Sequence, residues 1–203
     1  MEIFMMGIEK NDEEIRIMKG YARCCVFFNG QYYEVDIESA ECHFNAVQNE
    51  MEMRKNHGDF SFLCSHELLV SECSNAAILS ALKGAAQEGI LPYFSQLPLM
   101  NWDKAEGVDV FSRANVTFPD GRMMNKHLLR YQERLFSFVI EKHDHPVSDF
   151  ILRNDYDDEA ELRGIIDMLA ESGIFAEFEP HYAIAMTELR LLWKDQKDIS
   201  VGV

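Results

Sequence analysis

Residues 21–37, YARCCVFFNGQYYEVDI, decide the fold that we expect for the first half of this chain. Two runs rich in β-branched and aromatic residues, 21–28 and 31–37, flank the dipeptide Asn29-Gly30. Asn-Gly is favoured in type I′ turns, whose twist matches that of two antiparallel strands. The stretch therefore predicts a β-hairpin, and the apolar residues within 15–18 predict a preceding strand that extends the hairpin into a small sheet.

Two helices are expected after this hairpin. Ser39 can cap the first helix, which ends before Gly58, and Ser74 or Asn75 can cap the second, which ends at Gly89. The second helix carries few charges, so we expect it to be buried. Residues 68–70, just before it, fit either a strand or the start of the helix. The apolar positions of the first helix are Phe44, Val47 and Met51.

The second half of the chain is expected to be mostly helical. Pro92 and Pro98 interrupt regular structure and favour a boundary between two domains, 1–100 and 101–203, although the length of the chain also fits one domain. Apolar residues at helical spacing predict a long helix over 125–142, and a capping-box-like start at Asp158 predicts another that ends at Gly173. The remaining expectations are two strands at 108–111 and 115–118 that pair with each other, one or two helical turns within 147–153, strands at 174–178 and 182–187, and a closing helix over 188–193. The chain from Tyr182 onward fits a continuous helix equally well.

The order of helices and strands over 125–194 resembles that of the winged-helix domain. The stretch 168–192, MLAESGIFAEFEPHYAIAMTELRLL, is similar to the third helix and wing of that domain. The expected fold class is therefore α+β. An N-terminal antiparallel hairpin with two helices precedes a helical half with winged-helix-like topology.

The net charge restricts the class of partner. The chain contains 19 Lys and Arg against 35 Asp and Glu, a net charge of −16. Binding to nucleic acids and to anionic membranes depends on basic side chains, so we expect neither partner. An acidic surface attracts basic proteins, although it also serves solubility alone.

The sequence predicts a cytoplasmic location. Its first residues, MEIFMMGIEKNDEE, lack the basic region and the apolar run of a signal peptide. Apolar runs elsewhere are shorter than the ~20 residues of a membrane span. The five cysteines are an odd number and indicate free thiols in a reducing compartment rather than a disulfide framework.

Cysteines and histidines gather between residues 42 and 73, but their spacing predicts no metal site. Zinc sites usually take two ligands from one turn, as CxxC or HxxxH pairs, and neither pair occurs here. We therefore predict no metal and no cofactor. His143 and His145 are interpreted as solvated residues at a helix end. The cysteines and histidines considered are Cys42, His43, His57, Cys64, His66 and Cys73.

Cys73 is the candidate nucleophile of an alternative function. It precedes the expected helix start at Ser74, where the helix dipole would lower its pKa and favour the thiolate. His66 is the nearest candidate base. This arrangement is faintly similar to that of papain-like hydrolases, which place a cysteine at a helix start, and it suggests a thiol hydrolase.

Two groups of charged residues are the candidate partner-binding residues. The basic group recurs every four residues and forms a stripe on the expected helix over 125–142, where it can contact a phosphate backbone, an acidic partner or acidic elements of the same chain, of which pairing within the chain or between subunits is favoured. The acidic group precedes and begins the next helix. The basic group is Lys126, Arg130 and Arg134, and the acidic group is Asp155, Asp157, Asp158, Glu159 and Glu161.

These observations predict a non-enzymatic, acidic interaction module that binds and neutralises a basic protein, as inhibitors, antitoxins and immunity proteins do. No Gly-rich phosphate loop, HExxH, paired CxxC or GxSxG motif occurs in the sequence. Two other functions stay open: a thiol hydrolase that uses Cys73 and His66, and a transcription regulator that uses the winged-helix-like half. A homodimer also stays open as the oligomeric state.

Overall fold

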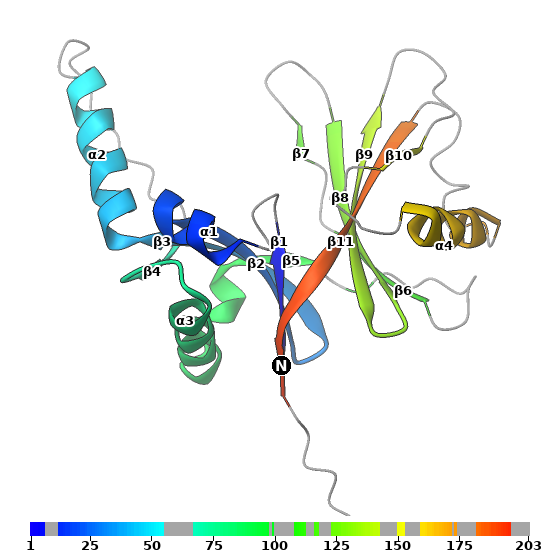
Figure 1. The fold of residues 1–203 in the computed structure, drawn as a ribbon, viewed down its shortest axis with the longest axis horizontal. Coiled ribbons are helices and arrows are strands. Elements are labelled where there is room, and N and C mark those ends of the chain that lie inside the picture. The colour runs from blue at the N-terminus through cyan, green and yellow to red at the C-terminus, as the bar shows by residue number, and fades with distance from the viewer. Residues whose placement is uncertain are drawn as a thin grey trace, which may run out of the picture. The chain divides into compact units, whose positions relative to one another are not determined.

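The computed structural model describes residues 1–6, 12–54, 67–97, 99, 108–112, 116–117, 123–142, 150–152, 159–171, 173 and 182–195. The chain divides into two compact units (Figure 1). Unit 1 comprises Met1–Gln96 together with the residues from Arg190 onward, and unit 2 comprises Leu97–Leu189. Within the described part of the chain, no helix combines the length and the apolar composition needed to cross a bilayer.

The predicted hairpin is confirmed and forms the centre of unit 1. Strands β2 (Tyr21–Phe28) and β3 (Gln31–Ser39) pair antiparallel across Asn29 and Gly30, whose φ angles are 51° and 81°. Two positive φ angles are what a type I′ turn requires. β1 (Glu2–Met6) pairs antiparallel with β2, and the last residues of β11 (Tyr182–Lys194) pair antiparallel with β1.

The strand predicted over 15–18 is wrong, because these residues belong to helix α1 (Glu13–Lys19). The Asp12 side chain accepts a hydrogen bond from the backbone N–H of Ile15 at 3.0 Å, and Gly20 ends the helix in a left-handed conformation. These caps are typical helix boundaries and outweigh the short apolar pattern.

Both predicted helices of unit 1 are confirmed. α2 (Ala40–Arg54) follows Ser39, and α3 (Asn75–Gln87) follows Ser74. Residues 68–70, which fitted strand or helix, belong to β4 (Glu67–Val70), which pairs parallel with β3. A short 3-10 helix, η2 (Leu91–Tyr93), and β5 (Ser95–Leu97), which pairs with β3, follow α3.

The core of unit 1 lies between one face of the sheet and α3. Ile78, Leu82 and Ala85 of α3 are buried against residues such as Val26 and Ile37. The expectation that this apolar helix is buried holds for one face only, because the other residues of 75–87 are half-buried or exposed.

The predicted helix over 125–142 is wrong, and with it the mostly helical, winged-helix-like second half. This segment forms an antiparallel hairpin of β8 (Met123–Tyr131) and β9 (Arg134–Lys142). β6 (Val108–Ser112) and β7 (Val116–Thr117) both pair with β8 rather than with each other. Unit 2 is therefore rich in strands, and its longest described helix is α4.

The helix over 125–142 was predicted wrongly because the hairpin of β8 and β9 is buried on both faces. Such strands appear as continuous apolar runs, in which helical spacing occurs by chance. The turn of this hairpin also contains no glycine or asparagine that would mark it in the sequence. The residue with a positive φ is Gln132, at 56°. The consecutive buried residues are His127, Leu128 and Leu129 on β8, and Leu135, Phe136, Ser137 and Phe138 on β9.

Three further elements complete the described part of unit 2. The predicted helix after Asp158 is confirmed as α4 (Glu159–Glu171), but the helical turns expected within 147–153 are wrong where described, since β10 (Phe150–Leu152) is a strand. The closing helix over 188–193 is also wrong, because β11 continues as one strand to Lys194. β11 pairs antiparallel with β9 and parallel with β10. The strand expected at 174–178 lies outside the described residues.

Gly20 provides a test of how tightly unit 1 is packed at the start of α2. A Cβ atom at Gly20 would lie 2.5 Å from Ser39 Oγ and 2.7 Å from Cys42 Cβ, whereas one at Gly89 would meet nothing within 4 Å. Both residues have a positive φ, so alanine is strained at either position. We expect Gly89→Ala to lower the free energy of unfolding by about 1 kcal/mol, and Gly20→Ala to lower it by roughly 2 kcal/mol more. Equal losses in urea denaturation would contradict the close packing at Gly20.

His127 predicts a dependence of stability on pH. Its ring is buried and stacked on that of Phe138, with ring centroids 4.8 Å apart, and burial lowers its pKa to about 4. The unfolded chain, with a histidine pKa of about 6.5, therefore binds more protons between these two values. We expect stability to fall as the pH is lowered from about 6.5 to about 4, by up to roughly 3 kcal/mol from this group. Urea denaturation of His127→Gln should show a shallower pH dependence than that of the wild type, and equal slopes would contradict the assignment.

Candidate functional site

The start of α2 joins three elements of unit 1. Ser39, the last residue of β3, accepts a hydrogen bond at its Oγ from the backbone N–H of Cys42 at 3.2 Å and so caps α2. The backbone N–H of Ser39 donates to the carbonyl of Gly20 at 2.8 Å, at the end of α1. The position and direction of the first turn of α2 are therefore determined by β3 and α1.

His43, in this first turn, lies between two carboxylates. Its Nδ1 is 3.0 Å from Glu38 Oε2 on β3 and 3.4 Å from Glu67 Oε2 on β4. The three ligand atoms all lie within 4.8 Å of one another. The side chains are largely buried, with 28% of His43 and 16% of each glutamate exposed. Among the described residues, this is the one group of three side chains with the arrangement of a metal site.

Local sequence spacing could not reveal this group. His43 was one of the histidines considered for zinc, but its carboxylate neighbours come from two strands that become adjacent only through the parallel pairing of β3 and β4. The one useful signal is that Glu38 alternates with the buried residues of β3 and so faces the same side as the first turn of α2. Of the other residues considered, His57, Cys64 and His66 lie outside the described residues.

Cys73 does not have the environment of a nucleophile. Its side chain is buried, its Sγ lies 3.9 Å from the Ile37 carbonyl oxygen, and burial raises its pKa. The expected lowering of the pKa by the start of α3 is therefore wrong. The Ser74 Oγ accepts from the N–H of Ala77, and a Glu13 carboxylate oxygen accepts from the N–H of Asn75 at 2.7 Å. The backbone N–H groups of Asn75 and Ala77 therefore donate to Glu13 and Ser74 rather than to the sulfur of Cys73.

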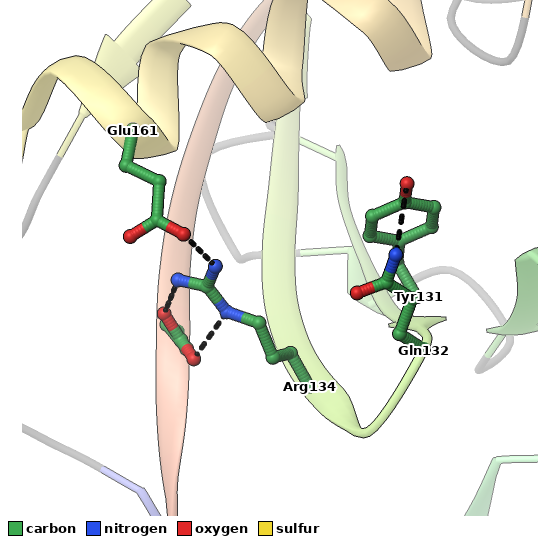
Figure 2. A network of polar contacts seen from close by, with 5 residues as sticks. Tyr131, Gln132, Arg134 and Glu161 are labelled. Carbon is green, nitrogen blue, oxygen red and sulfur yellow. Dashed lines mark hydrogen bonds and ion pairs between the residues drawn. The ribbon is translucent and has the colours of Figure 1, made fainter.

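The basic stripe does not exist as a helix face. Lys126 and Arg130 lie on β8, and Arg134 begins β9. The guanidinium of Arg134 donates two hydrogen bonds to Glu188 of β11, at 2.9 and 2.7 Å, and one to Glu161 of α4, at 2.8 Å. Figure 2 shows Arg134 turned toward Glu161, beside the turn that carries Tyr131 and Gln132. Pairing of this basic residue within the chain, one of the predicted uses of the stripe, is confirmed for Arg134.

The acidic residues predicted to bind a partner have different positions. Asp155, Asp157 and Asp158 lie outside the described residues. Glu159 is the first residue of α4, and Glu161 follows two positions later, exposed but paired with Arg134. Of the residues predicted to bind a partner, Arg134 and Glu161 therefore form an ion pair with each other.

Three half-buried acidic side chains of β3 lie on one face of the sheet. Its residues alternate, so that Glu34, Asp36 and Glu38 share the face opposite Val35 and Ile37. The hydroxyl of Tyr21 donates to Asp36 at 2.7 Å, and Arg23 forms an ion pair with the same carboxylate. Partial burial and the hydrogen bond to Asp36 raise the pKa of Tyr21 to about 12.

α2 itself is poorly covered. Its described side chains from Glu41 to Glu52 are all exposed or half-buried, and Figure 1 shows the helix extending from the sheet of unit 1. The exposed fraction is 60% for Phe44 and 49% for Met51. These residues were predicted as the apolar positions of the helix, but they face solvent.

Comparison of the chain with protein-family models, with curated proteins and with solved structures gave no match. The assignment of a function therefore depends on the geometry and the charge described above.

The two carboxylates on Arg134 should differ in their importance for stability. Glu188 is 15% exposed and binds the guanidinium through two oxygens, whereas Glu161 is 54% exposed and binds through one. We expect Glu188→Gln to lower the free energy of unfolding by about 1 to 3 kcal/mol, because it removes charged hydrogen bonds from a half-buried guanidinium. Glu161→Gln should cost less than about 0.5 kcal/mol, as solvent screens an exposed pair. Chemical denaturation measures both, and a larger loss for Glu161→Gln would contradict this order.

Proposed function

We propose that this chain is an acidic, cytoplasmic protein-interaction module that binds and neutralises a basic protein partner. Inhibitors, antitoxins and immunity proteins act in this way. The observation that supports the proposal best is the apolar stripe of α2, which consists of Phe44, Val47 and Met51. Phe44 and Met51 are exposed, and Val47 is half-buried.

The stripe has the geometry of a helix that docks into a groove. Residues separated by three and by seven positions lie on one side of an α-helix, so Phe44, Val47 and Met51 form one surface. Phe44 and Met51 are among the exposed large hydrophobic residues of the described chain. Exposed apolar side chains that are grouped in this way are typical of interaction surfaces.

The charge around the stripe supports a basic partner. Glu41 and Glu52 are exposed on the same helix, and the whole chain carries a net charge of −16. Complementary charge accelerates encounter with a basic partner and disfavours acidic ones, while the apolar stripe provides area to bury.

The cytoplasmic part of the proposal is supported by the thiols. The described cysteines, Cys24, Cys25, Cys42 and Cys73, are all free. Free cysteines are usual where the compartment is reducing.

The double variant Phe44→Ala/Met51→Ala tests the proposal. A basic protein recovered with the wild-type chain should bind the purified chain more weakly as salt increases, since exposed charges are screened. The double variant should weaken this binding at least about tenfold, because large apolar side chains dominate interface energies. Gln48→Ala, at an exposed polar position of the same helix, is the matched control and should bind as the wild type does.

Two results would overturn the proposal. The first is a partner whose affinity does not change in the double variant. The second is self-association of the wild-type chain that the double variant abolishes, as measured by light scattering, because a second copy would then occupy the stripe.

A further inference from the structure

We propose that Glu38, His43 and Glu67 bind a divalent first-row transition cation at the start of α2. This inference is independent of the partner proposed above, since it concerns side chains that are largely buried rather than the exposed stripe. Failure of either proposal leaves the other intact.

The distances between the ligand atoms fit such an ion. Zn²⁺ and similar ions lie about 2.0 to 2.2 Å from imidazole nitrogen and carboxylate oxygen. Two ligand atoms at this distance are about 3.0 Å apart when they subtend a right angle at the ion, and about 3.4 Å apart at the tetrahedral angle. His43 Nδ1 lies 3.0 Å from Glu38 Oε2 and 3.4 Å from Glu67 Oε2, so both of these spacings match an ion that the three side chains share, and the two carboxylate oxygens lie within 4.8 Å of each other.

The ligand types select the class of ion. Imidazole nitrogen suits zinc, copper, iron and nickel, whereas Ca²⁺ and Mg²⁺ prefer sites built only from oxygen. Two carboxylates and one imidazole offer two negative charges and three ligands. An ion held by three protein ligands keeps at least one position for water or for another ligand.

The three side chains are held by regular structure. Glu38 lies on β3 and Glu67 on β4, and these strands pair in parallel register, with Asp36 opposite Glu67 and Glu38 opposite Leu69. His43 is positioned by the first turn of α2, which Ser39 caps. Ligands that are positioned by their backbones lose little conformational entropy when an ion binds.

The competing explanation is that His43 only forms ion pairs with the two glutamates. Replacement of one glutamate distinguishes the two cases, because an ion pair requires no added metal, whereas a metal site loses affinity when a ligand is removed. Glutamine keeps the shape of glutamate and removes its charge, so Glu38→Gln and Glu67→Gln are the informative variants.

Isothermal titration calorimetry of the metal-free full chain, prepared without a histidine tag, tests the proposal with Zn²⁺, Mn²⁺, Ca²⁺ and Mg²⁺. We expect a one-to-one site for Zn²⁺ that weakens at least about tenfold in Glu67→Gln and in Glu38→Gln, as one ligand is lost. Glu41→Gln, which removes an exposed carboxylate from the same turn of α2, is the matched control and should leave the affinity unchanged. Zn²⁺ should also raise the melting temperature of the wild type more than that of Glu67→Gln, since an ion that binds the folded state stabilises it.

Three results would overturn the proposal. Absence of a Zn²⁺ site, or an equal affinity of wild type and Glu67→Gln, would leave only the ion pairs. An equal weakening by Glu41→Gln would indicate a general effect of charge. Binding of Ca²⁺ or Mg²⁺ as tightly as Zn²⁺ would exclude the transition-metal assignment. Circular dichroism of each variant ensures that a loss of affinity does not reflect a loss of fold.

Discussion

The alternation of side chains along β3 is the constraint on which unit 1 depends. Successive residues of a strand face opposite sides, so Val35 and Ile37 enter the core beneath the sheet while Asp36 and Glu38 face away from it. A shift of one residue in the pairing with β2 would exchange these two sets. The Asn29-Gly30 turn prevents such a shift, because it determines which residues of the two strands lie opposite each other.

Sequence reasoning worked where the signals were local. The hairpin, α2, α3 and α4 each begin or end at residues with a specific conformational preference, such as Asn29-Gly30, Ser74 and Gly173. It failed for β8 and β9, where both strand faces are buried and the turn has no glycine, so the apolar pattern fitted a helix equally well. The strand β1 was not predicted for a related reason. All five of its residues are buried, so its sequence lacks the alternation of apolar and polar residues that indicates a strand.

The candidate site was less accessible to sequence reasoning than the fold. Glu38 and His43 are close in sequence, but Glu67 lies near them only because β3 pairs with β4. No local sequence pattern predicts this pairing. Charge counting had a similar limit. It found Arg134 and Glu161, yet it could not show that the two bind each other and that Glu188 accepts two hydrogen bonds from the same guanidinium. Net charge describes the whole surface, whereas the use of an individual charge depends on which elements become neighbours.

The pairing of β1 with β11 has a consequence for the order in which the chain can fold. Glu2 lies opposite Lys194, so the ladder that completes the unit 1 sheet joins residues from the two ends of the described chain. During synthesis, β1 leaves the ribosome long before its partner and can form only its ladder with β2 until β11 emerges. Contacts of such large sequence separation form slowly, because the entropy of closing a long loop must be overcome first. During this interval the second edge of β1 presents a row of backbone hydrogen-bonding groups that can pair with other chains. A chaperone that covers this edge would prevent such pairing.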